Sequence, residues 1–375
     1  MLYLILIFTF LSLAIYFLTL LFFIFSLLFI KSNNYKKIKI KNVSVIICVR
    51  NGQNSIKNVL NDLKKQQFLG EIEFIIVDDD SNDKTKEIIL EFSRLDSRFK
   101  YVHSNKGSKN LSFKKKAIDA GIKNSQFDYL LFTDVDCRLK NNWAQSMMNQ
   151  YDNNINYIIG CSIVKDSSKF VSKFQKIDFL MLMISAMASS NLKIPLACSG
   201  QNQSYKKDLY CSLNGFNNIS HLLQGDDSIF MQLCKKKGLL NTVFNLNKES
   251  FVSSKIQFSW KSLFLQRIRW AGDANIMWNY NIKFYIILLT TFITNLFYLF
   301  IPIIFLDCFI YIIYFYSLKF IFELLLYYFG IKKIKEKFKF LDFILWFIIQ
   351  APYVVLVGIL SFYANRFRWK GRVII

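Results

Sequence analysis

Two aspartates separated by one residue, Asp134 and Asp136, follow the apolar run that begins at Tyr129. In a strand, alternate side chains point to the same face, so this pattern predicts that both carboxylates point the same way. Two carboxylates on one side repel each other unless a cation lies between them, and Mg²⁺ or Mn²⁺ take oxygen ligands and bridge carboxylates to phosphates. We therefore expect Asp134 and Asp136 to bind Mg²⁺ or Mn²⁺. A solvated loop after a strand is the alternative for these two residues alone.

Acidic residues occur at two further places where they could do chemistry. The apolar run 73–77 ends in Asp78 and Asp79, and Asp226 and Asp227 begin a stretch with helical spacing. A carboxylate beside a substrate hydroxyl can accept its proton as a general base. Acids in the first turn of a helix are also favoured by the helix dipole, so capping is the alternative role for Asp226 and Asp227.

A basic and aromatic cluster lies nearer the C-terminus, at Gln266, Arg267, Arg269 and Trp270. The planar guanidinium of an arginine matches the geometry of phosphate oxygens. Contact with lipid headgroups is the alternative role for these arginines, and packing against a membrane-side helix is the alternative for Trp270.

The segments that would position these residues alternate between strands and helices. The spacing predicts strands over 43–52, 73–83, 100–103 and 129–134, and helices over 55–67, from 84 and over 112–123. This alternation indicates an α/β fold with a parallel sheet and right-handed crossovers. Ligands bind such sheets outside the carboxyl ends of the strands, and the acidic residues occur at those ends.

The two ends of the chain are far more apolar than the middle. Hydrophobic residues make up 53% of the 375 residues, and residues 2–30 hold no charge. This first run is long enough to span a bilayer, and five lysines follow within 31–41. The positive-inside rule then places the amino terminus outside and the middle domain in the cytoplasm. We expect the net charge of +22 to form a membrane-apposed basic surface rather than a nucleic-acid site, although a coding bias towards lysine would give the same count.

Apolar runs near 284–306, 308–329 and 341–363 predict further spans, with Asp307 between the first two. Three spans after a cytoplasmic domain would leave the basic tail outside, against the positive-inside rule. One of the three segments is therefore expected to be re-entrant or interfacial. Pro352 makes the segment 341–363 the candidate. These runs are almost free of polar groups, which disfavours a transporter. The segment 169–192 has helical spacing and is either a core helix or a helix in the membrane interface. The seven scattered cysteines are typical of reduced thiols, and two histidines are too few for a histidine-based zinc site.

Taken in order, these motifs resemble those of the membrane-bound family 2 glycosyltransferases over Val43 to Trp270. The resemblance rests on four segments: Asp78-Asp79-Asp80-Ser-Asn-Asp83, the Asp134-Val-Asp136 motif, Gly225-Asp226-Asp227, and Gln266-Arg267-Ile-Arg269-Trp270. The last is similar to the Gln-x-x-Arg-Trp signature of cellulose, chitin and hyaluronan synthases and of ceramide glucosyltransferase. The opening strand from Val43 is also similar to the family's first strand, although Cys48-Val49-Arg50 replaces its usual Pro-Thr-Tyr type of ending.

The resemblance implies a GT-A nucleotide-sugar-binding domain with a mostly parallel, Rossmann-like sheet, flanked by transmembrane helices. It implies residue roles as follows: Asp227 as the catalytic base with Asp226 beside it; Asp79, Asp78, Lys115, Asp134, Gln266, Arg267, Arg269 and Trp270 as nucleotide-sugar ligands; and Asp134 and Asp136 as metal ligands. Asp79 is the better candidate than Asp78 for the base ring, because one of two adjacent acids must point away. A carboxylate accepts well from the imide of uracil, so a UDP-sugar is favoured over a GDP-sugar.

The implied activity is inverting transfer of a hexose-type sugar to a hydroxyl of a membrane lipid or a lipid-linked glycan. A processive polysaccharide synthase is one alternative, and a non-catalytic membrane assembly subunit with a degenerate transferase fold is another. We expect six segments: an N-terminal transmembrane helix (1–30), a basic linker (31–42), the catalytic domain (43–250), an interfacial segment (251–282), a C-terminal transmembrane region (283–365) and a basic tail (366–375).

Overall fold

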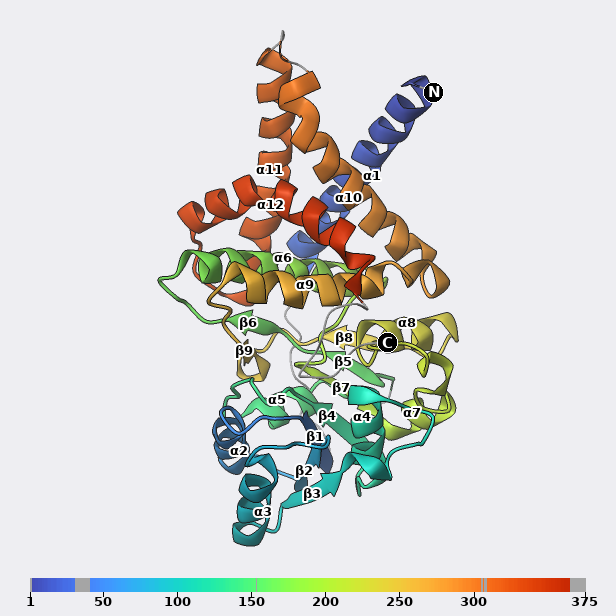
Figure 1. Ribbon diagram of the computed structural model, residues 1–375, viewed down its shortest axis with the longest axis vertical. Coiled ribbons are helices and arrows are strands. Elements are labelled where there is room, and N and C mark those ends of the chain that lie inside the picture. The colour runs from blue at the N-terminus through green and yellow to red at the C-terminus, as the bar shows by residue number, and fades with distance from the viewer. Residues whose placement is uncertain (1, 31–40, 153, 305, 307–308, 365–375) are drawn as a thin grey trace.

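A seven-stranded mixed sheet forms the centre of the catalytic domain (Figure 1). The computed structural model describes residues 2–30, 41–152, 154–304, 306 and 309–364, so most of the expected linker 31–42 and the whole tail 366–375 lie outside the described residues. The strand order is β3-β2-β1-β4-β7-β5-β8, and β7 runs antiparallel to both of its neighbours. The sheet strands are β1 (Val43–Val49), β2 (Ile72–Asp78), β3 (Phe99–His103), β4 (Tyr129–Phe132), β5 (Tyr157–Ile159), β7 (Gln203–Lys206) and β8 (Thr242–Phe244). The prediction of a mostly parallel α/β sheet is confirmed.

Helices cover both faces of this sheet because the side chains of its strands alternate. Val45 and Ile47 pack with α2, α3 and α5, whereas Ile46 lies between them and packs on the opposite side with α4. Both faces are apolar and buried, as a parallel sheet between helix layers requires. The helices are α2 (Ile56–Lys64), α3 (Thr85–Leu95) and α5 (Trp143–Met148) on the first face, and α4 (Phe113–Lys123), α7 (Lys207–Ser212) and α8 (Ser228–Lys236) on the second.

A layer of two helices separates the catalytic domain from the apolar helices. It consists of α6 (Phe170–Asn191) and α9 (Trp260–Ala274), and a two-stranded sheet of β6 (Ser162–Val164) and β9 (Val252–Ser254) lies beneath it (Figure 1). Most side chains of α6 are buried, including Lys176 and Asp178, and α6 packs against α1, α11 and α12. Of the two expectations for the segment 169–192, the structure therefore shows the core helix.

Among the residues that the structure describes, four helices are long and apolar enough to cross a membrane. They are α1 (Leu2–Phe29), α10 (Ile282–Ile304), α11 (Phe309–Ile334) and α12 (Phe340–Ser361). In Figure 1, α1, α10 and α11 extend away from the catalytic domain, while α12 runs across α6 and α9. The helix α12 continues through Pro352, which singled it out in the sequence.

The expectation that these helices are almost free of polar groups is wrong for α11. Lys319 lies 2.9 Å from Glu323 one turn away, and both side chains are at most 2% exposed. Glu323 also accepts hydrogen bonds from Tyr16 of α1 and from Gln350 of α12, the latter at 2.9 Å. The charges are thus paired with each other, and they join α1, α11 and α12.

Asn202 joins the central sheet to the loops around it. Its amide nitrogen donates to the backbone oxygens of Cys161 and Ser250 at 2.9 and 2.8 Å, and its oxygen accepts from the indole nitrogen of Trp143 at 3.0 Å. Asn202 is fully buried, so no water can replace these bonds. Gly200 lies two residues before Asn202, and its backbone nitrogen contacts the side chain of Asp227, which is described below.

We predict that Asn202→Ala destabilises the protein by about 3 kcal/mol, because three buried hydrogen bonds are lost and two of the buried groups, the Ser250 oxygen and the Trp143 indole nitrogen, lose the partner that Asn202 gave them. This corresponds to a fall in Tm of roughly 5–10 °C for a domain of this size. Thermal unfolding of the detergent-solubilised protein measures it. The matched control is Asn54→Ala at an exposed position, where we expect a Tm within about 2 °C of the parent. Equal Tm values for the two variants would contradict the role given to Asn202.

Candidate active site

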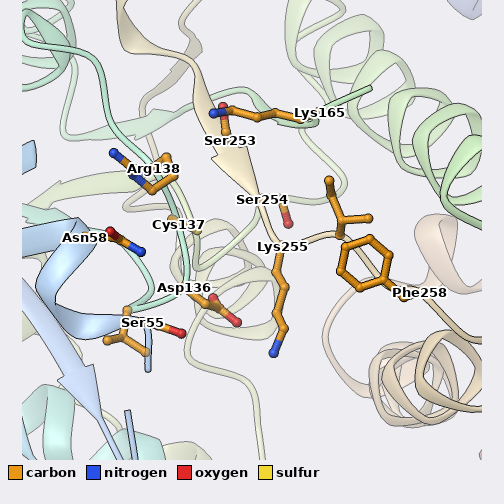
Figure 2. A pocket seen from close by; sticks show the side chains of 12 residues that line it. Ser55, Asn58, Asp136, Cys137, Arg138, Lys165, Ser253, Ser254, Lys255 and Phe258 are labelled. Atoms are coloured by element: carbon orange, nitrogen blue, oxygen red, sulfur yellow. The ribbon is translucent and has the colours of Figure 1, made fainter. Parts of the chain in front are cut away.

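Asp134 and Asp136 lie in a turn beyond β4, which ends at Phe132. The backbone nitrogen of Cys137 donates to the oxygen of Asp134 at 3.1 Å and closes this turn. Because the strand has ended before these residues, strand alternation does not set the directions of their carboxylates, and the expectation that they point the same way stays a prediction. Asp134 pairs with Lys114 of α4. Asp136 lines an open cavity together with Ser55 at the start of α2 (Figure 2).

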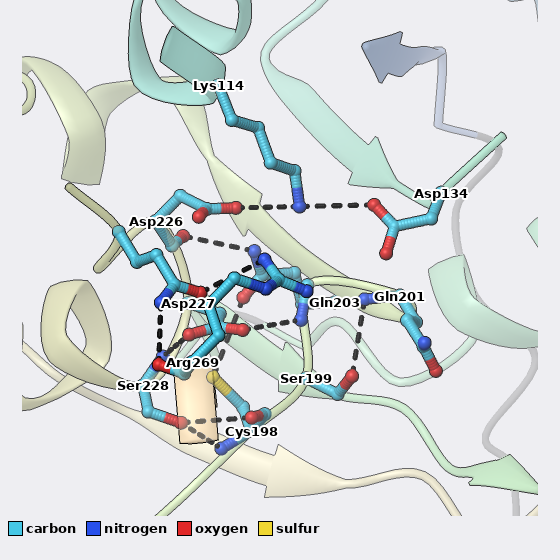
Figure 3. A network of polar contacts seen from close by, with 12 residues as sticks. Lys114, Asp134, Cys198, Ser199, Gln201, Gln203, Asp226, Asp227, Ser228 and Arg269 are labelled. Atoms are coloured by element: carbon cyan, nitrogen blue, oxygen red, sulfur yellow. Dashed lines mark hydrogen bonds and ion pairs between the residues drawn. The ribbon is translucent and has the colours of Figure 1, made fainter. Parts of the chain in front are cut away.

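The ammonium of Lys114 connects two acidic loops. Its Nζ lies 3.1 Å from Oδ1 of Asp134 and 2.9 Å from Oδ2 of Asp226 (Figure 3). Burial opposes the charge on this amine, but the two carboxylates outweigh it and raise the pKa of Lys114 well above its ordinary value. The structure thus brings Asp134 together with Asp226 across the sheet edge, and it places positive charge between them.

Asp227 is the N-cap of α8, and its carboxylate is held from two sides. Oδ1 accepts from the backbone nitrogen of Ser228 at 2.5 Å, and Oδ2 accepts from the backbone nitrogen of Gly200 at 3.0 Å. Burial and the neighbouring charge of Asp226 raise the pKa of Asp227 to about 6. The capping role considered for this pair is present, and the same carboxylate also has the pKa of a general base that works near neutral pH.

The two acids at the end of β2 have different surroundings. Asp78 accepts from the backbone nitrogen of Ser81 at 3.1 Å and from the hydroxyl of Tyr101 at 3.3 Å, so its carboxylate holds the following turn. Asp79 is buried, and its backbone nitrogen donates to Val49 at the end of β1 at 2.8 Å. This difference favours Asp79 over Asp78 as a ligand of a base ring.

Lys115 does not lie with the acidic cluster. Its fully buried ammonium donates to the backbone oxygens of Ile219, Leu222 and Gln224, the last at 3.2 Å. Burial lowers the pKa of Lys115 to about 8. The nucleotide contact expected of Lys115 is not what the structure shows. Lys115 fixes the loop that leads to Asp226, and its neighbour Lys114 faces the acids.

The residues of the Gln-x-x-Arg-Trp segment face two directions from α9. Arg267 forms an ion pair with Asp178 of α6 at 2.8 Å. The central carbon of its guanidinium lies 4.4 Å from the centre of the Trp270 ring. Gln266 accepts a bond from Arg267 at 3.2 Å. These contacts hold Arg267 and Trp270 of α9 against α6.

Arg269 faces the other way, towards the loop before Asp226. Its Nη1 donates to the side-chain oxygen of Gln224 at 3.2 Å, and the amide of Gln224 donates to the backbone oxygen of Arg269 at 2.7 Å (Figure 3). Of the segment Gln266–Trp270, Arg269 is the residue that the structure places at the acidic cluster.

Asp273 belongs to the same site and was missed in the sequence. Burial and the charges of Asp227 and Asp226 raise the pKa of Asp273 to about 8, and Arg269 opposes this shift. Asp273 lies four residues after Arg269 on α9, so both side chains share one helix face. The four-residue spacing between Arg269 and Asp273 was the sequence signal for this residue. It points to the site only when α9 is known to lie over the acids.

The donor set suits a hard cation, although no group of three or more His, Cys, Asp or Glu side chains is arranged to hold a metal in the part of the chain that the structure describes. Oδ2 of Asp226 is buried and lies 2.9 Å from the ammonium of Lys114, so this corner of the site favours positive charge. Asp134 and Asp136, two carboxylates in one turn, are the residues present that fit Mg²⁺ or Mn²⁺.

Curated relatives cover parts of the chain. It is 29% identical over 126 residues to the uncharacterized glycosyltransferase EpsJ of Bacillus subtilis, a match that covers 34% of this chain and 35% of that protein. It is 23% identical to the poly-beta-1,6-N-acetyl-D-glucosamine synthase of Staphylococcus epidermidis, covering 45% and 39%. It is 25% identical to the GalNAc(5)-diNAcBac-PP-undecaprenol beta-1,3-glucosyltransferase of Campylobacter jejuni, covering 45% and 56%. The matches thus span about a third to just over half of each relative's length.

One solved structure resembles almost the whole chain. The mannosyltransferase PcManGT from Pyrobaculum calidifontis, in complex with GDP-Man and Mn²⁺, superimposes with a TM-score of 0.57 at 13% identity over 95% of this chain and 96% of that one. This similarity shows a shared fold. The model of Glycosyl transferase family 2 matches residues 44–211, and that of Glycosyl transferase family group 2 matches residues 129–359, more than half of the chain. The chain therefore belongs to the family 2 glycosyltransferases and has their GT-A fold.

Proposed function

We propose that this enzyme transfers a hexose-type sugar from a nucleotide sugar to a hydroxyl of a membrane-associated acceptor, with inversion at the sugar carbon. One observation carries the proposal: Lys114 bridges Asp134, on the donor side of the sheet edge, and Asp226, which adjoins the base candidate Asp227. A donor at the strand ends and a base at the start of α8 would meet at this bridge.

In this proposal Asp227 accepts the proton of the attacking hydroxyl. The backbone nitrogens of Gly200 and Ser228 fix its carboxylate, and its raised pKa keeps it basic enough to take a proton near neutral pH. Lys114 and Arg269 supply positive charge around the same pocket, where the departing diphosphate would gain negative charge. Asp134 and Asp136 are the residues that would hold Mg²⁺ or Mn²⁺, which would act as a Lewis acid towards the diphosphate when bound. Attack from the side opposite the diphosphate gives inversion.

We propose UDP as the nucleotide of the donor. Asp79 is buried beside the end of β1, where a base ring would lie, and a carboxylate there accepts from the imide of uracil. Guanine also presents an N–H donor, and PcManGT was solved with GDP-Man. A panel of UDP- and GDP-sugars therefore decides the donor.

The acceptor is proposed to be a lipid or a lipid-linked glycan. The relative from Campylobacter jejuni is named for a polyprenyl-diphosphate-linked acceptor, and here the acidic site lies next to the helix layer that carries the four apolar helices. We propose an integral membrane protein whose catalytic domain is cytoplasmic, where nucleotide sugars are available. The relative from Staphylococcus epidermidis is named as a polysaccharide synthase, so long polymer among the products would identify processive synthesis instead.

A non-catalytic assembly subunit is the competing function from another class. Such a subunit would have no need to keep Asp227 on two backbone donors with Lys114 and Arg269 close by. The arrangement of Asp227, Lys114 and Arg269 favours the enzyme.

We predict that Asp227→Asn lowers the turnover number by about 10²- to 10⁴-fold, because an amide cannot accept the proton. Release of labelled sugar from a UDP-sugar panel onto a lipid extract, with Mn²⁺ present, measures it. The matched control is Asp208→Asn at an exposed position on α7, where we expect unchanged turnover. Full activity of Asp227→Asn with intact folding would support the assembly-subunit hypothesis or identify another base.

The pKa of about 6 for Asp227 sets the expected pH dependence. A general base works in its ionised form, so turnover should be level above the pKa and fall about tenfold per pH unit below it. Turnover at saturating substrate between pH 5 and pH 8 measures this profile. A profile that rises as the pH falls through 6 would be inconsistent with a carboxylate base.

Substitution of Lys114 should lower the catalytic efficiency with the donor, whereas substitution of Lys115 should mainly lower the thermal stability. Lys114→Met removes the positive charge between Asp134 and Asp226, so we expect at least tenfold lower kcat/KM for the donor, together with a lower Tm from the repulsion between the two carboxylates. Lys115→Met leaves three backbone oxygens without their donor, so its main effect should be a Tm lower by several degrees. Donor kinetics and thermal unfolding of both variants test this. A reversed pattern would show that Lys115 is the nucleotide ligand.

A further inference from the structure

The helix α12 touches the layer of α6 and α9 along its whole length. Asp342, in its first turn, lies 3.9 Å from the ammonium of Lys173 on α6. Tyr353 packs on α6, and Ser361, in the last turn, accepts a hydrogen bond of 3.0 Å from Asn275 at the end of α9. From Asp342 to Ser361 a helix advances about 28 Å, close to the ~30 Å thickness of the hydrocarbon core of a bilayer. A helix that crosses a membrane touches a domain on one side of it only near one end, so α12 lies along the layer.

The two helices beneath α12 belong to the catalytic domain. The helix α6 packs on β6 and β8 and carries Lys176, which is paired with the exposed Asp166. The helix α9 exposes Lys261 and presents Arg269 to the acidic site. Charged groups at these positions would be costly in the hydrocarbon core of a membrane. The layer therefore keeps α12 at the surface of the domain, whereas α1, α10 and α11 extend away from it (Figure 1).

The helix α12 is apolar on two opposite faces. The side chains of one face are buried against the neighbouring helices: Phe343, Trp346, Tyr353 and Val357. Those of the other face recur at helical spacing and are between 45% and 79% exposed: Leu341, Ile348, Leu356 and Ile359. A long apolar stripe of this kind is rarely left in water, so the outer face of α12 is expected to have an apolar partner.

The connection that leads from α11 into α12 is strongly basic. Residues 332–339 hold five lysines and one glutamate. That glutamate, Glu336, is already paired with a lysine of α6 at 3.5 Å. Lys332, Lys335 and Lys337 are exposed, and none of them is paired with an acid among the residues that the structure describes. Surplus positive charge beside an exposed apolar face matches the surface of a membrane that contains anionic lipids.

We propose that α12 does not cross the membrane but lies in the interface of one leaflet, with its exposed stripe in the lipid and the lysines of the 332–339 connection on the phosphates of anionic headgroups. This surface is continuous with α1, α10 and α11, which are long and apolar enough to cross the same bilayer. A second copy of the chain related by a two-fold axis through this face would bring the surplus lysines of both chains together, which is unfavourable. The proposal concerns how the catalytic domain is held at the membrane and does not depend on the sugar that is transferred.

This position of α12 also sets the place of the acidic site. Tyr353 of α12 and Arg267 of α9 both contact the carboxylate of Asp178 on α6. The same helix α9 carries Arg269 to the acids. The depth of α12 in the interface therefore fixes the height of the site above the membrane surface, from which a membrane-anchored acceptor would approach.

Quenching by brominated lipids measures the depth of α12 in nanodiscs of the full-length protein. A fluorescent non-natural amino acid replaces Leu341, Ile348 or Ile359, one at a time, and bromine is placed near either the headgroup end or the tail end of the acyl chains. We expect the headgroup-side bromine to quench more strongly, with the same ratio at all three positions, because a helix in the interface keeps its outer stripe at one depth.

The helix α11 supplies the matched control. Ile310 and Ile321 are both exposed, and they lie about 16 Å apart along a helix that extends away from the domain. The tail-side bromine should therefore quench a probe at Ile321 more strongly than one at Ile310. A probe at Leu69, which is exposed on the catalytic domain, should not be quenched by either lipid.

Two results would overturn the interfacial position of α12. A graded profile, with Ile348 deeper than Leu341 and Ile359, would show that α12 crosses the membrane. No quenching at any of the three positions would refute the lipid contact, and a doubled mass of the particle would then assign the face to a second copy of the chain. These measurements need neither donor nor acceptor, so their outcome is independent of the proposed transfer.

The headgroup contact is tested with the double variant Lys335→Gln/Lys337→Gln. Phosphatidylglycerol added to the detergent-solubilised parent protein should raise its Tm more than phosphatidylcholine does, and the variant should lose at least half of this difference. Lys57→Gln/Lys65→Gln, at two exposed lysines of the catalytic domain, is the matched control and should keep the full difference. An unchanged difference in Lys335→Gln/Lys337→Gln would refute the contact of these lysines with anionic headgroups.

Discussion

The site depends on one ammonium group placed among carboxylates. Asp134, Asp226 and Asp227 come from two loops at one sheet edge, and like charges this close would push the loops apart. Lys114, from a helix between them in space, lies 3.1 Å from Asp134 and 2.9 Å from Asp226. Its charge offsets the repulsion and sets the distance between the two loops. A diphosphate and its cation would therefore enter a site whose charge balance is already organised.

The loop that carries Asp227 is fixed from three directions. Lys115 binds three of its backbone oxygens from inside the domain, and Gln224 and Arg269 bond each other in both directions from the helix layer. Gly200, close to the buried Asn202 network, holds the carboxylate of Asp227 itself. The position of the Asp227 carboxylate thus depends on α4, on α9 and on the central sheet, so a disturbance in any of them reaches it.

The helix α9 connects the membrane side of the protein with this chemistry. Arg267 anchors it to Asp178 of α6, and Tyr353 of α12 lies 3.5 Å from the same carboxylate. Further along the same helix, Arg269 and, one turn after it, Asp273 face the acids. The arginines of the Gln-x-x-Arg-Trp segment therefore divide two tasks, with Arg267 holding the helix and Arg269 serving the site. The buried Lys319–Glu323 pair and its contacts with Tyr16 and Gln350 join α1, α11 and α12 above this layer.

The sequence by itself determined the alternation of strands and helices, the four apolar segments and the acids at the strand ends, because these follow from local periodicity and from the rule that parallel strands end at one edge. It did not determine the direction of single side chains. Lys114 rather than Lys115 reaches the acids because adjacent residues on a helix point about 100° apart. Asp273 joined the site only when α9 folded over it. The directions of these side chains depend on contacts between residues far apart in the chain. Only the tertiary structure brings those residues together.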